Sequence, residues 1–492
     1  MNIIEAKKIE NANFKEAIRR WPRFFESQTF IDDQKLLEKY GIQIPEKKKL
    51  PLGYLKLWPQ DFIVEEIAAN NELQTVFPDK FIHKKRDFLP EDPIIYTTLV
   101  KCGLSTIEAA EDLARALNLE PKSIKFAGIK DKHAITSQLI SMKRGEIAET
   151  ASHLSPRSAS PLSVIERLNQ ISLPNFFLKN VFSGENGLYL GNLKGNQFTI
   201  LIRTGPNFKK EEFLKRLKEI EKNGFFNFFY LQRFGVPRLT NQDCGLYVLK
   251  GDYEKAAFTA ICKPGARELL YFQSLRKEIE KLWGKWEAIE EVLELFPLTF
   301  RDERTVVNYL IKNPTDFLGA INQIPRVLQL WLTSFTALLF NKLLSSYSGM
   351  GKTPPEALPL VLSERKGDWL IYKDLLNQVG VFSTTFALKN LKPFPFIVLK
   401  KREQKTIEKV KILSQKIIPE GVILQFVLSK GCYATTFLSQ LFNLASGNLP
   451  KNFSNLPIDT KANLNQPSLE EILNKFSDVV SSPSWRLLWR IY

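Results

Sequence analysis

The chain has few of the residues that build disulfides and metal sites. Its 492 residues hold only four cysteines and three histidines. None of the cysteines lies in a CxxC pair, and the histidines are equally scattered; these residues are Cys102, Cys244, Cys262 and Cys432, and His83, His133 and His153. This spacing predicts no zinc site or other metal site. A disulfide framework is not expected in so long and cysteine-poor a chain, and a reducing cytoplasm fits it best.

Long hydrophobic runs are also missing. The first residues, MNIIEAKKIENANFKEAIRRW, are polar and charged and contain no hydrophobic segment of a signal peptide. The most apolar run, residues 327–340, has 14 residues and includes Gln329 and Thr333. Because roughly 20 apolar residues are needed to span a bilayer, we expect a buried core helix there rather than a membrane span.

Positive charge is what the chain has in excess. Lysine and arginine number 69 against 53 acidic residues, which gives a net charge of +16. Hydrophobic residues make up 44%, so a sizeable core is possible and wholesale disorder is not expected. The charge suggests a polyanionic partner, nucleic acid first and an anionic membrane surface second. Because no strong amphipathic cationic helix supports the second, we expect no membrane partner.

Hydrophobic periodicity predicts strands on both sides of a helical middle region. Strands are expected at 54–67, broken near Pro59, and at 187–203 and 410–429, with Gly-Asn turns at 191–192 and 195–196. Helices are expected at 105–117, 209–222, 253–262, 266–283, 286–295, 303–312, 325–347, 433–444 and 468–479. The first 50 residues are interpreted as a helical extension. This order predicts one α+β domain that is interrupted by a mostly helical insertion.

The stretch KFAGIKDKHAITSQ (125–138) places a carboxylate between two lysines on a turn between two predicted strands. Lys130 and Lys132 would favour the ionised form of Asp131. In a partly dry pocket, an ionised carboxylate can act as nucleophile or general base. The alternative is an ordinary charged hairpin turn.

The stretch GFFNFFYLQRFG (224–235) is the second candidate for a functional site. Its aromatic rings offer faces for base stacking, which contributes roughly 1–3 kcal/mol per base, or they fill a core. Arg233 could bind phosphate or pair with a carboxylate. Residues 433–436 open a predicted helix, whose free N–H groups could bind phosphate or simply start the helix.

These segments resemble, in order, the motifs of the TruD family of tRNA pseudouridine synthases. FAGIKDKHAITSQ (126–138) is similar to the family signature G-x-K-D-x-x-A-x-T-x-Q. Five further segments resemble family motifs: YLKLWPQDFIVEE (54–66), LGNLKGNQFTILIR (190–203), NFFYLQRFG (227–235), ALLFN (337–341) and LQFVLSKGCYATTFLSQLF (424–442). The resemblance implies an α+β pseudouridine-synthase core with a mixed, mainly antiparallel sheet, interrupted by the family's own insertion.

Combined with this resemblance, the sequence predicts five parts. They are an N-terminal helical extension (1–50), the first part of the catalytic core (51–245), a TRUD-type insertion domain (246–405), the second part of the core (406–447) and a C-terminal tail (448–492). The implied reaction converts uridine in tRNA to pseudouridine, usually at position thirteen, without a cofactor. A monomer is expected. The alternatives are an RNA-binding or RNA-folding protein of the same fold, or a substrate other than tRNA.

The resemblance also implies functions for single residues. Asp131 falls on the essential aspartate, which either attacks C1′ or removes the C2′ proton. Lys56 falls on a lysine near that aspartate, with Arg233 as the rival charge partner, and Phe229 falls on the phenylalanine that packs on the target base. The other implied active-site residues are Phe62, Lys130, Asn227, Gln232, Tyr433, Ala434 and Thr435.

Two positions depart from the family pattern. Tyr230 stands where the family usually has glycine, and is expected at the rim of the pocket. Gln60 replaces the usual acidic residue before Asp61, which could weaken a contact to Lys56 or to RNA.

Overall fold

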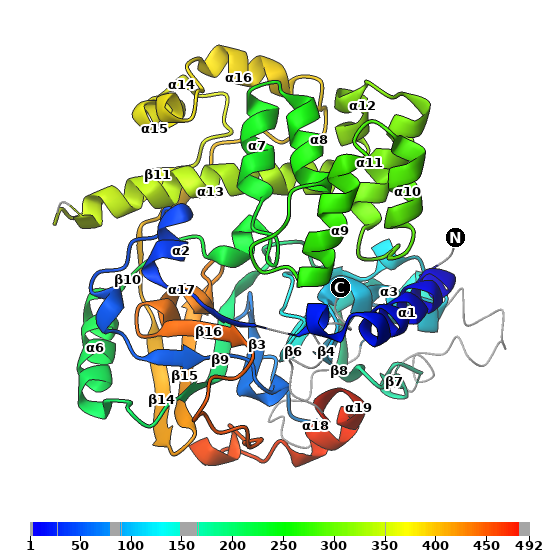
Figure 1. Ribbon diagram of the computed structural model, residues 1–492. Helices are drawn as coiled ribbons and strands as arrows, with labels where there is room; N and C mark the ends of the chain where they lie inside the picture. Colours follow the sequence, from blue (N-terminus) through cyan, green and yellow to red (C-terminus); the bar gives the residue numbers. More distant parts are fainter. Residues whose placement is uncertain are drawn as a thin grey trace.

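The computed structural model describes residues 3–26, 28–78, 89, 91–147, 165, 167–349 and 351–481. One large mixed sheet lies against a layer of helices (Figure 1). The strands of this sheet are β1 (Thr29–Ile31), β2 (Leu52–Tyr54), β3 (Phe62–Ala68), β4 (Ile94–Cys102), β5 (Lys125–Phe126), β6 (Ile135–Lys143), β7 (Ser172–Leu173), β8 (Phe176–Gly184), β9 (Leu193–Thr204), β14 (Lys411–Ile418), β15 (Gly421–Ser429) and β16 (Asn443–Gly447).

The sheet is mixed but mainly antiparallel, as predicted. Its order is β1-β16-β2-β9-β3-β6-β4-β8-β7, with β14 and β15 attached beside β9 and β5 beside β6. Among the described strand pairs, β16–β2 and β3–β6 run parallel and the others antiparallel. The predicted α+β fold is therefore confirmed.

The centre of the sheet is formed by β3, β9 and β15, which are rich in β-branched and aromatic residues. The rings of Phe198 on β9 and Phe426 on β15 stack with their centroids 5.3 Å apart. Gly195, where a turn was predicted, instead pairs with Ser429 inside β9. A Cβ on Gly195 would lie 2.2 Å from the Leu428 carbonyl oxygen, so glycine is required here by close strand contact, and the turn prediction is wrong.

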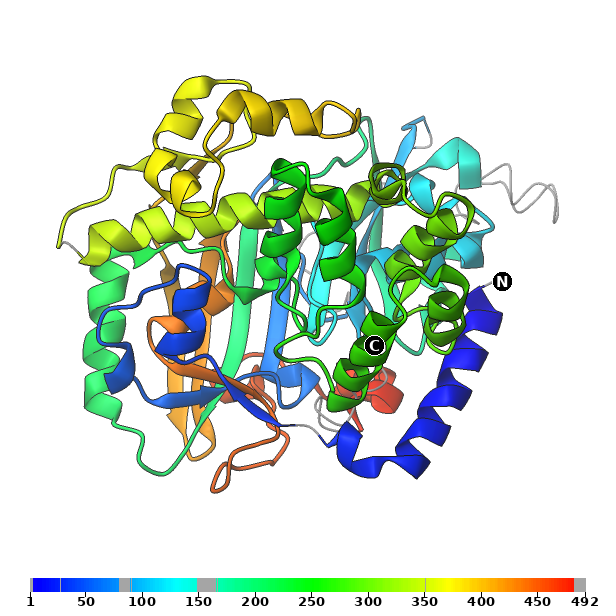
Figure 2. The ribbon, with the colours of Figure 1, turned by 45° about the horizontal axis from the view of Figure 1, so that its top comes forward.

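The helical layer is built from the middle of the chain. Its helices are α7 (Asn241–Leu249), α8 (Tyr253–Ile261), α9 (Leu270–Lys281), α10 (Trp286–Leu293), α11 (Arg301–Lys312), α12 (Phe317–Asn322), α13 (Pro325–Gly349), α14 (Lys366–Leu370), α15 (Lys373–Gln378) and α16 (Thr384–Leu391). The long helix α13 runs across the sheet domain, and α14–α16 lie on its far side (Figures 1 and 2).

Helix α13 contains the apolar run of the sequence. The helix is long and apolar enough to cross a membrane, but 61% of its most apolar stretch is buried inside the protein. It packs against α7 so closely that a Cβ on Gly245 would lie 2.3 Å from the Trp331 carbonyl oxygen. The prediction of a buried core helix is confirmed.

The helices with strong local signals form as predicted. The helix α3 (Thr106–Leu117) begins at Ser105, whose hydroxyl accepts from the Glu108 N–H while the Glu108 carboxylate accepts from the Ser105 N–H. The helix α6 (Lys210–Asn223) ends at Gly224, which adopts a positive φ of 87°.

Both ends of the chain differ from the predictions. The N-terminal part contains α1 (Ile3–Arg20) and α2 (Gln34–Lys39), but residues 29–31 form β1, an edge strand that pairs with β16. The predicted helix 433–444 is only α17 (Ala434–Ser439), because the chain enters β16 at Asn443. The predicted helix 468–479 is divided into α18 (Glu470–Lys475) and α19 (Ser477–Val480), which pack on the sheet through a shared hydrophobic cluster.

Candidate active site

Asp131 lies in the turn between β5 and β6, and the end of β4 holds this turn in place. The Lys101 ammonium, buried on β4, donates to the Asp131 carbonyl at 2.8 Å and to the Leu104 carbonyl at 2.7 Å. The Lys130 N–H donates to the Thr106 hydroxyl at 2.9 Å. The backbone of the turn is therefore fixed, while the Asp131 side chain stays 39% exposed.

Lys56 is the charge partner of Asp131. Its Nζ lies 2.7 Å from Asp131 Oδ1 and 4.1 Å from the centre of the Phe62 ring. The backbone of Lys56 has φ +59°, a left-handed conformation that non-glycine residues seldom adopt and that is frequent at functional sites. Within the described part of the chain, no hydrogen bond is found to the second carboxylate oxygen, Oδ2.

The electrostatics keep Asp131 ionised. Burial raises the pKa of its carboxyl, but the charge and hydrogen bond of Lys56, with the charge of Lys101, outweigh burial and hold the pKa below its usual range. At neutral pH the site therefore contains a carboxylate with one oxygen bound to an ammonium.

The two neighbouring lysines do not supply this charge, so the sequence argument from them was wrong. Lys130 Nζ pairs with Glu66 at 2.6 Å in a fully buried ion pair, and Lys132 Nζ pairs with Glu108 at 2.9 Å. Each lysine is thus held by a carboxylate other than Asp131.

His133 faces the same cleft as Asp131 but is not charged. Burial, together with the positive charges of Lys56 and Lys132, lowers the pKa of its imidazole to about 4. His83 and His153 lie outside the described residues. Across the described ranges, no group of three or more His, Cys, Asp or Glu side chains could hold a metal ion.

The cleft has two lobes that meet at four residues: Lys56, Asp131, Gln232 and Thr435. The first lobe is a cavity of about 430 Å³, and the second is one of about 310 Å³. Nine of the eleven predicted site residues line the first lobe: Lys56, Phe62, Lys130, Asp131, Gln232, Arg233, Tyr433, Ala434 and Thr435. The Thr435 hydroxyl donates to Gln232 Oε1 at 3.2 Å and links α17 to this site.

Phe229, the predicted stacking residue, does not line either lobe in this structure. It is 6% exposed, and its ring meets the edge of Phe340 at 5.4 Å. The Arg233 guanidinium covers the ring at 5.2 Å. The buried Asn341 of α13 holds the Phe229 backbone by accepting from its N–H at 2.9 Å and donating to its carbonyl at 2.8 Å.

Asn227 forms hydrogen bonds that hold two distant segments of the backbone together. Its side-chain amide donates to the Lys405 carbonyl at 3.0 Å, and its N–H donates to the Thr406 carbonyl at 2.9 Å. Asn227 follows the short strand β10 (Phe225–Phe226) and is not part of it. The chain then passes into a 3-10 helix, Leu231–Phe234.

Arg233 reaches the first lobe from this short helix. No carboxylate among the described residues lies within ion-pairing distance of its guanidinium, and its Nε is buried without a hydrogen-bond partner. Because Lys56 neutralises Asp131, Arg233 is available for a negatively charged substrate group.

The two departures from the family pattern lie elsewhere than expected. Gln60 is buried and lines neither lobe, and its carbonyl accepts from the Thr460 hydroxyl. Tyr230 is not at a rim: its ring is buried in the wall of the second lobe, and its hydroxyl donates to Asp32 Oδ2 at 2.7 Å.

Sequence reasoning missed Asp32 and Arg267, which line the second lobe, and the buried Lys101, which binds the Asp131 carbonyl. A lysine inside the apolar strand 94–102 is a signal that could have identified Lys101, since a buried lysine needs partners. For Asp32 and Arg267 the sequence carries no local signal.

Comparison with known proteins indicates the same family as the sequence motifs. The family model of tRNA pseudouridine synthase D (TruD) matches residues 48–359. A probable tRNA pseudouridine synthase D of Thermococcus sibiricus is 26% identical, covering 79% of this chain and 94% of the relative. A probable tRNA pseudouridine synthase D 1 of Methanocaldococcus jannaschii is also 26% identical, covering 79% and 95%.

The fold also has a counterpart among solved structures. The crystal structure of the putative tRNA pseudouridine synthase D (TruD) from Methanosarcina mazei aligns with a TM-score of 0.58 and 24% identity, covering 82% of this chain and 97% of that one. The family model covers more than half of the chain, and the relatives are matched over nearly their whole length. The protein belongs to the TruD family of tRNA pseudouridine synthases.

Proposed function

We propose that this protein isomerises a uridine of tRNA, at position thirteen, to pseudouridine, and that Asp131 is the catalytic carboxylate. The observation that carries the assignment of Asp131 is its pairing with Lys56 at 2.7 Å. This pairing keeps the carboxylate ionised at the point where both lobes of the cleft meet.

The reaction requires an ionised carboxylate and a closed pocket, but no redox step. The C1′–N1 bond breaks, the uracil turns, and C5 bonds to C1′. The proton on C5 is then lost, and N1 gains a proton, so the product is an isomer. Asp131 either attacks C1′ through a carboxylate oxygen or removes the C2′ proton, and both routes need the negative charge that Lys56 stabilises.

The first lobe is the proposed uridine site. It combines apolar walls, including Phe62 and Phe198, with Asp131 and Arg233. A uridine that has left the helical stack, at a cost of a few kcal/mol, would be enclosed there beside Asp131. Its phosphate would attract the Arg233 guanidinium and so uncover the face of Phe229 for the base.

Nucleoside mapping tests this proposal. A pool of unmodified tRNA transcripts is incubated with the wild-type protein or with Asp131→Asn, without added cofactor, and pseudouridine is located by sequencing after chemical derivatisation. Filter binding with the same transcripts controls for tRNA affinity.

We expect one new pseudouridine at position thirteen with the wild type and none with Asp131→Asn, although both proteins bind. The same product from both proteins would overturn the assignment of Asp131. No product from the wild type, despite tight binding, would overturn the proposed reaction on tRNA.

A further inference from the structure

The N-terminal segment connects the helical layer to the catalytic sheet. It precedes residue 48, where the match to the family model begins. Phe14 of α1 packs against Phe272 and Phe296, with ring centroids 5.8 and 4.9 Å apart. After α1 the segment joins the sheet through β1, and Figure 2 shows it in dark blue along this path.

Asp32, which follows β1, joins three parts of the chain beside Asp131. Its N–H donates to the Leu444 carbonyl at 2.7 Å, and its Oδ2 accepts from the Tyr230 hydroxyl. Its Oδ1 accepts from Arg267, which comes from the loop before α9. The side chains of Asp32 and Arg267 are only 8% and 11% exposed.

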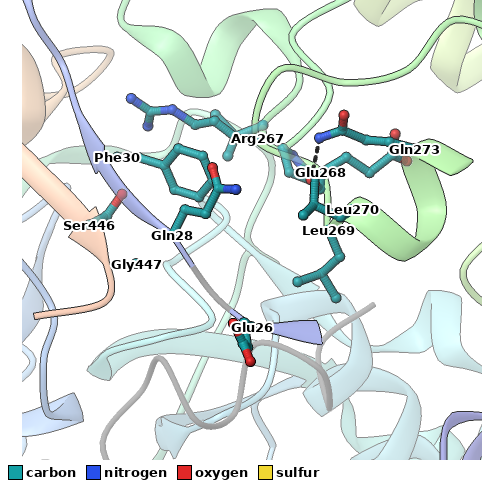
Figure 3. A pocket seen from close by; sticks show the side chains of 12 residues that line it. Glu26, Gln28, Phe30, Arg267, Glu268, Leu269, Leu270, Gln273, Ser446 and Gly447 are labelled. Carbon is teal, nitrogen blue, oxygen red and sulfur yellow. Dashed lines mark hydrogen bonds between the residues drawn. The ribbon is translucent and has the colours of Figure 1, made fainter. Parts of the chain in front are cut away.

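Arg267 lines two cavities that lie next to each other. Its guanidinium lies 5.6 Å from the centre of the Phe30 ring, and Figure 3 shows it extended beside that ring. Beyond Arg267, the second lobe continues into a smaller cavity of about 130 Å³, to which Phe30 and Leu269 contribute. The two cavities share Arg267, Val236, Ser446 and Gly447.

The second lobe has the composition of a nucleobase site. Tyr54, Tyr230 and Leu444 give it apolar walls, and His133 and Gln232 present polar groups. Because Asp32 neutralises Arg267, and Lys56 neutralises Asp131, the lobe carries no excess positive charge that would attract a phosphate. An uncharged, flat ligand with hydrogen-bonding edges fits these walls better than an anion.

The second lobe also adjoins the proposed uridine site. The two lobes share four lining residues, one of which is Asp131, and the second lobe lies on the other side of these residues from the proposed uridine site. A nucleotide bonded to the target uridine therefore reaches this lobe while the uridine occupies the first one.

We propose that the second lobe binds the nucleobase next to the target uridine, and that Asp32 is a positioning residue that holds Tyr230 and Arg267 in its wall. This inference rests on the proposed function. The N-terminal segment thereby contributes to substrate recognition.

The test uses a tRNA transcript that the wild type modifies and two derivatives, each with an abasic nucleotide at one of the two positions flanking the target. Single-turnover rates at subsaturating protein are measured for the wild type, Asp32→Asn and Asp243→Asn. The last is the matched control, because Asp243 forms a surface ion pair with Lys263 at 2.6 Å and lines neither lobe. Thermal unfolding followed by circular dichroism verifies that each variant is folded.

We expect the wild type and Asp243→Asn to lose about tenfold in rate at one abasic position, as loss of one stacked base predicts. We expect Asp32→Asn to be slower on the intact transcript and to show little further loss on the abasic one. If Asp32→Asn does not fold, it is replaced by the double variant Asp32→Asn/Arg267→Gln. The double variant removes both charges of the pair and so leaves no uncompensated buried charge.

Equal wild-type rates on all three RNAs would overturn the inference while leaving the proposed function intact. An undiminished abasic penalty in Asp32→Asn would show that Asp32 only stabilises the fold, and would also overturn it. Absence of pseudouridine from the wild type on every RNA would overturn the proposed function, and the inference with it.

Discussion

The protein contains two aspartates in similar positions, each shortly before a central strand and each paired with a cation that is distant in sequence. Asp61 precedes β3 and is fully buried. Both of its oxygens accept from Arg203 at 2.8 Å, and Oδ2 also accepts from the Trp58 N–H. Asp131 precedes β6, is partly exposed and is bound by Lys56 through one oxygen.

The difference supports the proposal that Asp131, and not Asp61, is the reacting carboxylate. An aspartate whose oxygens are all occupied by a bidentate arginine stabilises the fold but has no free group for a substrate. The ammonium of Lys56 maintains the charge of Asp131, and within the described residues no hydrogen bond occupies its other oxygen. The structural Asp61 and the proposed catalytic Asp131 therefore differ in how many hydrogen bonds their oxygens accept and in how exposed their side chains are.

The largest effect is expected from Asp131→Asn. It removes the charge that both proposed routes require, so we expect the rate of pseudouridine formation to fall by at least about 10³-fold. Nucleoside analysis of digested tRNA over a long time course measures this. The free energy of unfolding should change by less than about 1 kcal/mol, because the side chain is partly exposed.

Asp61→Asn should produce the opposite pattern. Breaking one side of a fully buried ion pair leaves Arg203 without compensation, at a cost of about 3–5 kcal/mol in the free energy of unfolding. Chemical denaturation at constant pH measures this cost. Normal stability of Asp61→Asn would mean that the two aspartates do not differ as described.

Lys56→Met should have an intermediate effect on activity. Without Lys56, burial dominates and the pKa of Asp131 rises, so a larger fraction of the carboxyl is protonated. We expect a rate loss of about 10²-fold near neutral pH. In the wild type, the loss of activity with falling pH should occur below the usual pKa of an aspartate.

The direction in which the pH–rate profile shifts tests the role of Lys56 more sharply than the size of the rate loss. In Lys56→Met the acid limb of the single-turnover pH–rate profile should move to higher pH than in the wild type. An unmoved acid limb would show that Lys56 does not set the ionisation of Asp131.

The smallest effect is expected from Lys132→Ala. Lys132 neighbours Asp131 in sequence, but its Nζ pairs with Glu108. We expect less than a twofold change in rate and an acid limb that coincides with that of the wild type. A shift of the acid limb as large as that of Lys56→Met would show that the lysines next to Asp131 in the sequence do control its ionisation.

Local signals in the sequence predicted much of the fold. Hydrophobic periodicity predicted the helix 105–117, where α3 lies, and strands at 187–203 and 410–429, where β9 and β15 lie. The edge strand β1 was not predicted, because its three residues become a strand only by pairing with β16. Gly195 was mistaken for a turn residue because the need for glycine comes from a neighbouring strand.

The motifs named residues that lie together in one cavity, but they did not indicate residues that only tertiary contacts bring to it. Nine motif residues meet in the first lobe. The left-handed conformation of Lys56 and the Asp32–Arg267 pair, 235 positions apart in sequence, depend on the order of the sheet and on the insertion. No spacing within a short window encodes such contacts.

The most direct test of the central claim is a single-turnover measurement with tRNA that carries tritium at C5 of its uridines. Release of this tritium to water reports completion of the isomerisation, because the C5 proton is lost as pseudouridine forms. Wild type, Asp131→Asn and Asp61→Asn are compared at saturating protein, with rates expressed per folded molecule. The account predicts release by the wild type and by folded Asp61→Asn, and none above background by Asp131→Asn. Release by Asp131→Asn at the wild-type rate would contradict it.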